Sequence, residues 1–300
     1  MKKITILKIF LTLLFFYILF YKIDINSILY VLQSLNIFFL ICALAMVPIL
    51  YLIRTWRWRY FLVSLGISLP FYQSFKIMLI GNFYGLITPG KIGEFGRAFH
   101  ISEKKSLTIP TIIMEKLLDI VVLVILSIIT ILYFFQDSTF MKITIFLISI
   151  GVFVAIYLSI NEKFMGLIGK TFGISPENVG NFIITFKKLI RNYPIVIKSV
   201  LITIIYYFIA YCIAFFIVIS GNMKLEGIFM LPIVVLMGNI PITISGLGLR
   251  ESIGSLCFVL LGESAANGFV FSLLLFIFIT VIPAIFGYVI IMIGGINDNV

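Results

Sequence analysis

Residues 81–97 read GNFYGLITPGKIGEFGR, an apolar run that breaks at Thr-Pro-Gly and continues into a charged segment. A related break follows at residues 238–251, GNIPITISGLGLRE, which shares the Gly-Asn pair, a small residue plus Gly at the break, and a nearby Gly and Glu. Irregular backbone survives at membrane depth only where protein or water covers its polar groups. Two matched breaks therefore predict one internal site between two broken helices, a pattern typical of transporters.

The composition indicates a membrane protein. Hydrophobic residues make up 62% of the 300 residues and charged residues only 11%, with a mean hydropathy of +1.23. We predict an all-α polytopic integral membrane protein with about seven spanning helices, within a range of about six to eight. One or two broken or re-entrant helical hairpins are expected besides, and an inverted repeat is a candidate relation between them. The apolar segments are 4–20, 37–53, 71–88, 109–135, 143–160, 195–219, 226–245, 252–262 and 266–293.

Cysteine and histidine usage argues against a metal site or a disulfide. Cys42, Cys212 and Cys257 lie in separate apolar runs, and His100 is the only histidine. Buried cysteines behave as small apolar side chains, and one histidine without a paired Cys or His motif is a poor basis for a zinc or iron site. The chain also lacks the context of a dinucleotide fingerprint or a Walker loop. We expect no metal and no cofactor.

The net charge of +10 is better explained by topology than by a nucleic-acid partner. With a cytoplasmic N-terminus and a returning segment 71–88, most lysines and arginines fall inside, whereas a full span there would place residues 161–198 outside against the positive-inside bias. We therefore predict a multi-pass cell-membrane protein with an uncleaved first helix and a re-entrant first motif. Three crossings, 109–135, 143–160 and 195–219, separate the two breaks and place them on opposite faces.

Two amphipathic stretches are expected outside the bilayer core. Residues 24–36 place apolar side chains at helical spacing, which predicts a short helix on the outer surface. Residues 161–194 predict a cytoplasmic loop with a basic interfacial helix. Because this longest non-spanning stretch is far below the size of a folded domain, residues 1–300 are predicted to form a single transmembrane domain without a soluble synthase or glycosyltransferase part.

Arg54, Arg57 and Trp58 share one helix face after the second apolar segment. They form either a basic and aromatic interface anchor or an arginine pair for a lipid phosphate, because planar guanidinium groups give bidentate contacts. For the two arginines both interpretations stay open.

Glu115 and Asp119 stand four residues apart, on one face of the fourth apolar segment. An unpaired carboxylate is costly at that depth. We expect an intramembrane charge pair that neutralises Arg54, Arg97 or Arg250, with a proton-coupled role as the alternative.

Charged residues also follow both breaks. Salt bridges could close each turn, or the arginines could act with the exposed backbone amides around Gly90, Gly93, Gly246 and Gly248 as an anion-binding nest. No residue is assigned a catalytic role. The candidate substrate-binding residues are Arg54, Arg57, Pro89, Gly90, Gly93, Glu94, Arg97, Ser245, Gly246, Gly248, Arg250 and Glu251.

Four motifs occur in order along the chain: Arg54-x-x-Arg57-Trp58, Thr88-Pro89-Gly90-x-x-Gly93-Glu94-x-x-Arg97, Glu115-Lys116-x-x-Asp119 and Ser245-Gly246-Leu247-Gly248-x-Arg250-Glu251. Together they resemble the lysylphosphatidylglycerol synthase transmembrane-region family, also called flippase-like domain proteins, over nearly the whole chain. Lys116 stands where arginine is expected more often. The resemblance implies movement of aminoacylated phosphatidylglycerol or polyprenyl-linked sugars across the bilayer. Larger members carry a fused cytosolic aminoacyl-transfer or glycosyl-transfer domain, which we do not expect in residues 1–300.

Three functions compete at this point. The first is a translocase that binds the phosphate of an anionic phospholipid or of a polyprenyl-phosphate-linked headgroup between the two breaks. The second is a membrane-embedded enzyme that uses Glu94, Glu115 and Asp119 as acid or base, although histidine, serine and metal motifs are missing. The third is an accessory membrane subunit for a separate cytosolic lipid headgroup transferase.

Overall fold

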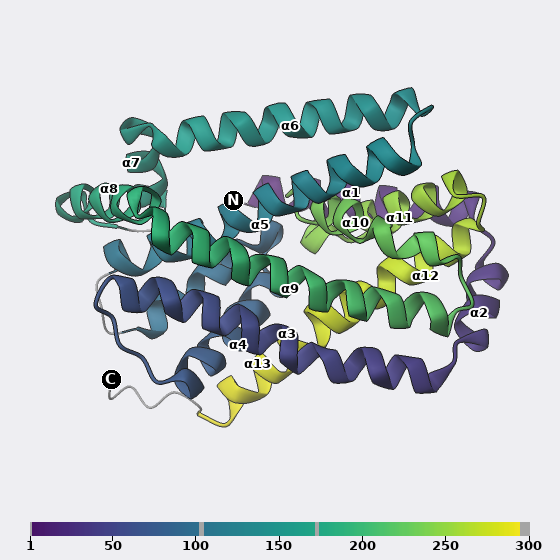
Figure 1. The fold of residues 1–300 in the computed structure, drawn as a ribbon, viewed down its shortest axis with the longest axis horizontal. Helices are drawn as coiled ribbons and strands as arrows, with labels where there is room; N and C mark the ends of the chain where they lie inside the picture. The colour runs from purple at the N-terminus through teal and green to yellow at the C-terminus, as the bar shows by residue number, and fades with distance from the viewer. Residues whose placement is uncertain (1, 102–104, 172–173, 295–300) are drawn as a thin grey trace.

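The computed structural model describes residues 2–101, 105–171 and 174–294, where helices are the only regular secondary structure (Figure 1). Within these ranges, four helices are long and apolar enough to cross a bilayer, and α1 becomes a fifth if its bent pair with α2 counts as one span. The all-α polytopic fold is thus confirmed, whereas the count of about seven spans stays a prediction. The four helices are α3 (Ile37–Ser64), α5 (Lys105–Phe134), α9 (Tyr193–Ser220) and the continuous stretch Ala265–Met292.

Three further helices complete the outline of the bundle. α1 (Lys2–Lys22) meets α2 (Ile25–Ser34) at a bend of 86°, and α2 caps one end of the bundle, where a short surface helix was expected (Figure 1). Asp24 caps α2 by accepting a hydrogen bond from the Asn26 amide at 3.2 Å. α6 (Thr139–Ile160) runs alongside α5 (Figure 1).

The other end of the bundle carries α7 (Glu162–Thr171) and α8 (Pro176–Arg191) (Figure 1). α8 buries Phe182, Phe186 and Leu189 in an apolar cluster with residues of α5, and its Lys187 forms an ion pair with Glu162 of α7. A basic helix therefore exists within the predicted 161–194 segment. Its position at a cytoplasmic membrane surface stays a prediction.

The first break forms a helical hairpin, as predicted. α4 (Phe71–Ile87) runs in, and the 3-10 helix η1 (Pro89–His100) runs back beside it. A Cβ on Gly81 would lie 3.2 Å from the Cβ of Arg97, and one on Gly85 would lie 2.5 Å from Cγ of Glu94. The small residues of α4 thus let the return limb approach closely. The hairpin leaves α3 and rejoins α5 at the same end of the bundle (Figure 1).

The second break forms a hairpin that enters from the opposite end (Figure 1). Its inward limb comprises η2 (Leu225–Met230) and α10 (Leu231–Gly238), its tip is η3 (Ile244–Gly246), and its return limb is α11 (Leu249–Leu260). A Cβ on Gly238 would lie 3.3 Å from Cδ of Arg250. Residues 226–262 therefore make a single hairpin rather than a span followed by a hairpin.

The two hairpins repeat one local arrangement. In each, the glycine of a Gly-Asn pair on the inward limb packs beneath an arginine of the return limb, Gly81 beneath Arg97 and Gly238 beneath Arg250. The tips also meet, because the Ser245 hydroxyl donates to the Leu86 carbonyl at 2.7 Å. Hairpins that enter from opposite ends and touch at their tips have the geometry of an inverted repeat.

The last span is interrupted beside the first hairpin. α12 (Ala265–Phe276) passes through the π-helical turn η4 (Ile277–Val281) into α13 (Ile282–Met292). Pro283 has no N–H for the carbonyl four residues earlier, that of Ile279, and this carbonyl instead accepts from the Tyr51 hydroxyl at 2.9 Å. Beside it, the Thr280 carbonyl accepts from the Asn82 amide at 2.8 Å. Such π-turns occur often at functional sites.

Candidate functional site

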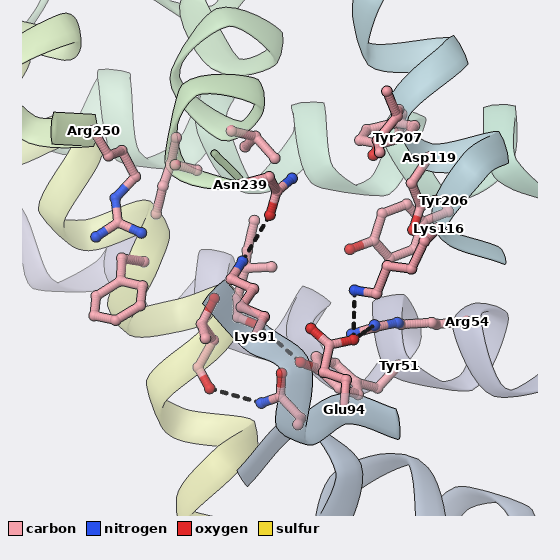
Figure 2. Close-up of a pocket in the computed structure, with 18 of the residues that line it drawn as sticks. Tyr51, Arg54, Lys91, Glu94, Lys116, Asp119, Tyr206, Tyr207, Asn239 and Arg250 are labelled. Carbon is pink, nitrogen blue, oxygen red and sulfur yellow. Dashed lines mark hydrogen bonds and ion pairs between the residues drawn. The ribbon is translucent and has the colours of Figure 1, made fainter. Parts of the chain in front are cut away.

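A cavity of about 290 Å³ lies where the two hairpin tips meet the spanning helices (Figure 2). It is lined by residues of α3, α4, η1, α5, α9, α10, α11, α12 and η4, so both hairpins and all four long apolar helices contribute. Its charged lining consists of four cationic and two anionic side chains: Arg54, Lys91, Lys116 and Arg250, and Glu94 and Asp119.

Beneath this cavity, Glu115 holds three guanidinium groups. Its Oε1 lies 3.1 Å from Nε of Arg54 and 2.9 Å from Nη2 of Arg57, and its Oε2 pairs with Arg97. The Glu115 side chain is 0% exposed. The three arginines come from α3 and η1, so this one carboxylate of α5 ties the first hairpin to the bundle. Charged groups buried this deeply need such pairing.

Asp119, one helical turn further along α5, pairs with Arg57 alone. The two side chains form a bidentate contact, with oxygen–nitrogen distances of 2.6 and 3.1 Å. Arg57 also donates to the Thr203 hydroxyl at 2.8 Å. Glu115 and Asp119 are thus both ion-paired, with Arg54, Arg57 and Arg97 as partners, and Arg250 is not one of them. Their depth in the membrane stays a prediction.

Glu94 is shared between two cations at the cavity wall. Its Oε2 lies 2.7 Å from Nη2 of Arg54 and 2.5 Å from Nζ of Lys116 (Figure 2). Lys116, which departs from the family motif, thus has a defined partner and faces the cavity. One carboxylate for two cations leaves a positive excess here.

Lys91 has no carboxylate partner among the described residues. Its ammonium donates to the Asn239 side-chain oxygen at 2.8 Å, which joins the first hairpin to the second (Figure 2). The residue adopts a φ of 57° just after the Thr-Pro-Gly break, a left-handed conformation that non-glycine residues seldom adopt. This turn places the ammonium at the cavity rather than along the hairpin.

Arg250 approaches from the second hairpin. Its Nε and Nη2 lie 3.1 and 2.6 Å from Oε1 of Glu251, and its guanidinium lies 3.9 Å from the centre of the Phe276 ring. Oε2 of Glu251 accepts from the Gly248 amide at 2.7 Å. Glu251 therefore closes the turn, as one of the two interpretations predicted, while Nη1 of Arg250 has no hydrogen-bond partner in the described part of the chain.

The predicted site residues thus divide into two groups. Arg54, Glu94 and Arg250 line the cavity. The remaining ones that the structure describes lie behind it: Arg57 and Arg97 are held in the ion-pair network, and the others shape the hairpin tips. For Pro89 and Gly90 only the backbone path in η1 is described. The described residues that lie behind the cavity are Arg57, Gly93, Arg97, Ser245, Gly246, Gly248 and Glu251.

Two of the four amides proposed for an anion nest are engaged within their own turns. The Gly93 amide donates to the Thr88 hydroxyl at 2.7 Å, and the Gly248 amide donates to Glu251. Side-chain cations rather than these amides therefore face the cavity. Sequence reasoning left Lys91, Asn82 and Asn239 out of the site, although Lys91 follows the first break directly and the Gly-Asn pair occurs in both hairpins.

The carboxylates of the site are occupied by arginine and lysine. Within the described ranges, no group of three His, Cys, Asp or Glu side chains is placed to hold a metal ion. The arrangement is suited to binding an anion, because cations outnumber carboxylates on a partly apolar wall.

Two comparisons with known proteins agree with this architecture. A family model described as the lysylphosphatidylglycerol synthase TM region matches residues 5–287. A UPF0104 membrane protein of Methanocaldococcus jannaschii is 31% identical over 180 residues, which cover 56% of this chain and 52% of the relative. The matched part of this chain thus spans about half the length of that relative.

Proposed function

We propose that this chain, which belongs to the lysylphosphatidylglycerol synthase transmembrane-region family, is a translocase that binds the anionic phosphate headgroup of a membrane lipid between its two hairpins. One observation carries the proposal: a cavity at the meeting point of two oppositely entering hairpins is lined by four cations and only two carboxylates. Buried cations within a membrane bundle mark substrate pathways.

The lining supplies recognition from both hairpins. Lys91 of the first hairpin and Arg250 of the second reach the cavity from different sides, and Lys116 and Arg54 reach it from α5 and α3 (Figure 2). Charge-assisted hydrogen bonds to phosphate are strong and directional. A phosphate bound here would draw Lys91 from Asn239 and so weaken the contact that joins the hairpins. Loosening that contact is the proposed first step in alternating access around a fixed site.

The topology proposed with this mechanism has a cytoplasmic N-terminus in the cell membrane. The end of the bundle that carries α7 and α8 would then face the cytoplasm, because it bears Lys163, Lys187, Lys188 and Arg191. The first hairpin would open to the cytoplasm and the second to the outside.

An enzymatic role is less well supported by the geometry. Glu94, Glu115 and Asp119, the three candidate acids or bases, are each held in ion pairs with arginine or lysine. The structure offers no observation in favour of an accessory role beside a separate transferase.

The test is lipid movement in vesicles that contain only the purified chain. Fluorescent phosphatidylglycerol and phosphatidic acid with a labelled acyl chain would be followed by chemical quenching of the outer leaflet. We expect Arg250→Gln to slow movement at least about tenfold, because a buried charged contact to the ligand is lost. Lys198→Gln is the control, because it removes an exposed cation that is not part of the cavity lining. Movement no faster than in protein-free vesicles, for every lipid tried, would refute the proposal.

A further inference from the structure

We infer that the cavity selects a lipid headgroup with two negative charges, a phosphomonoester or a diphosphate, over a singly charged phosphodiester or a cationic aminoacyl headgroup. This inference rests on the proposed function and adds the charge class of the substrate. It follows from where the unneutralised cations lie.

Three of the six cations around the cavity are each neutralised by one carboxylate. Arg57 forms a bidentate pair with Asp119, Arg97 pairs with Glu115, and Arg250 pairs with the adjacent Glu251. None of these three pairs adds net charge to the cavity.

Two positive charges remain, and both belong to the lining. Arg54 and Lys116 share the single carboxylate Glu94, which leaves one positive charge in excess. Arg54 also contacts Glu115, but that carboxylate is already matched by Arg97. Lys91 has only the neutral amide of Asn239 as its partner among the described residues, and its ammonium supplies the second charge when an anion is bound beside it.

A surplus of two charges sets the preferred ligand. Unpaired charge is expensive in an interior of low dielectric, and the cost falls as the ligand charge approaches minus two. A phosphodiester would leave one cation unpaired. A headgroup that carries an added amine would increase the surplus, so an aminoacylated lipid is disfavoured at this site.

The arrangement of donors agrees with the charge. In Figure 2, Arg250, Lys91 and the two cations that share Glu94, Arg54 and Lys116, approach from three sides. Among the described residues, Nη1 of Arg250 and two of the three Lys91 protons have no hydrogen-bond acceptor. A phosphomonoester offers three terminal oxygens, and at a pH above its second pKa of about 6 it carries about two negative charges. A phosphodiester offers only two terminal oxygens.

The experiment compares short-chain lipids with identical acyl chains on the full chain in detergent at a pH above that pKa. The probes are dihexanoyl phosphatidic acid, dihexanoyl phosphatidylglycerol, dihexanoyl phosphatidylcholine and chain-free glycerol 3-phosphate, with affinity measured by thermal stabilisation. We expect phosphatidic acid to bind at least about tenfold more tightly than phosphatidylglycerol, because the second charge meets a second cation. In Lys91→Gln the two lipids should bind with about equal affinity, whereas Lys198→Gln should keep the preference for phosphatidic acid.

The outcomes separate the two proposals. Equal or tighter binding of phosphatidylglycerol than of phosphatidic acid overturns the dianion inference and leaves the proposed function standing. No binding of either anionic lipid beyond that of phosphatidylcholine overturns both. If glycerol 3-phosphate binds as tightly as phosphatidic acid, the ligand is a free phosphate ester rather than a lipid. That result overturns the lipid assignment, while the preference for two charges stands. A Lys91→Gln protein that is folded without probe yet keeps the full preference overturns the assignment of Lys91.

Discussion

Replacing Glu115 by glutamine should destabilise this protein more than replacing Asp119 by asparagine. Glu115 is fully buried and contacts three arginines, whereas the Asp119 side chain is 15% exposed and contacts Arg57 alone. Removing one partner of a buried ion pair costs about 3–5 kcal/mol. We expect about that loss for Glu115→Gln. For Asp119→Asn we expect about 1–3 kcal/mol, because Arg57 keeps Glu115 and a hydroxyl partner.

The measurement is the free energy of unfolding in mixed micelles of mild detergent and dodecyl sulfate, together with the temperature at which the folded species disappears. A charge-balanced double variant, Glu115→Gln with Arg97→Met, supplies the control. Methionine can pack against Trp58 and Met78, the present neighbours of the Arg97 head group. The double variant should therefore recover at least half of the loss. Equal losses for the two single variants, or no recovery in the double variant, would refute the ion-pair account.

The same variants separate a structural role from proton coupling. If Asp119 carried a proton during transport, Asp119→Asn would fold as stably as the parent protein, and lipid movement would no longer respond to an imposed pH gradient. We expect the opposite, because both oxygens of Asp119 are engaged in a bidentate contact with Arg57, and losing one partner of a buried ion pair destabilises the fold. A stable Asp119→Asn protein with unchanged lipid movement at every pH would contradict both accounts.

Three further predictions concern topology, recognition and the second hairpin tip. Cysteines at Lys76 and at Lys104, which lies outside the described residues, should both be labelled from the cytoplasm, and labelling from opposite faces would exclude the proposed hairpin. Arg250→Lys should impair lipid movement in a complementation assay with normal expression, because lysine cannot replace the planar fork; wild-type lipid distribution would refute this. Arg97→Lys should instead lower stability, because Arg97 lies behind the cavity in its pair with Glu115; unchanged thermal stability would contradict that role. Gly246→Ala should cost more than about 1 kcal/mol, because φ is +77° and a Cβ there would collide with the backbone of Gly238; unchanged thermal stability would contradict that reason.

Broken apolar segments could be predicted from the sequence because glycine, proline and matched polar residues are unusual there. The Thr-Pro-Gly turn and the Gly-Asn pair both indicated hairpins, and Figure 1 shows the two hairpins entering from opposite ends of the bundle. The three crossings predicted between them stay a prediction, because α5 and α9 are the intervening helices that are long and apolar enough to span in the described residues. These features depend on short-range chemistry and on counting, which a single sequence provides.

Which arginines line the cavity and which are enclosed in ion pairs could not be predicted from the sequence in this way. Arg54 and Arg57 lie on one helix face, yet Arg54 reaches the cavity while Arg57 is enclosed by Glu115, Asp119 and Thr203. The difference depends on how α5 and α9 pack against α3, which is a long-range property. Lys91 was missed for a related reason, because its position depends on a left-handed residue in a tight return limb.

The two hairpins are related by architecture but differ in how their arginines are neutralised. Arg97 pairs across the bundle with Glu115 of α5, whereas Arg250 pairs with its own neighbour, Glu251. Arg97 follows its packing glycine by sixteen residues and Arg250 by twelve, and the longer first turn contains Lys91. The first hairpin therefore contributes an arginine of the buried ion-pair network and Lys91, which has no carboxylate partner among the described residues. The second hairpin contributes the Arg250–Glu251 pair and Asn239, which accepts the hydrogen bond from Lys91. An ideal symmetric repeat would give two equivalent half-sites, and this asymmetry instead places the unneutralised charge where both hairpins can contact one ligand.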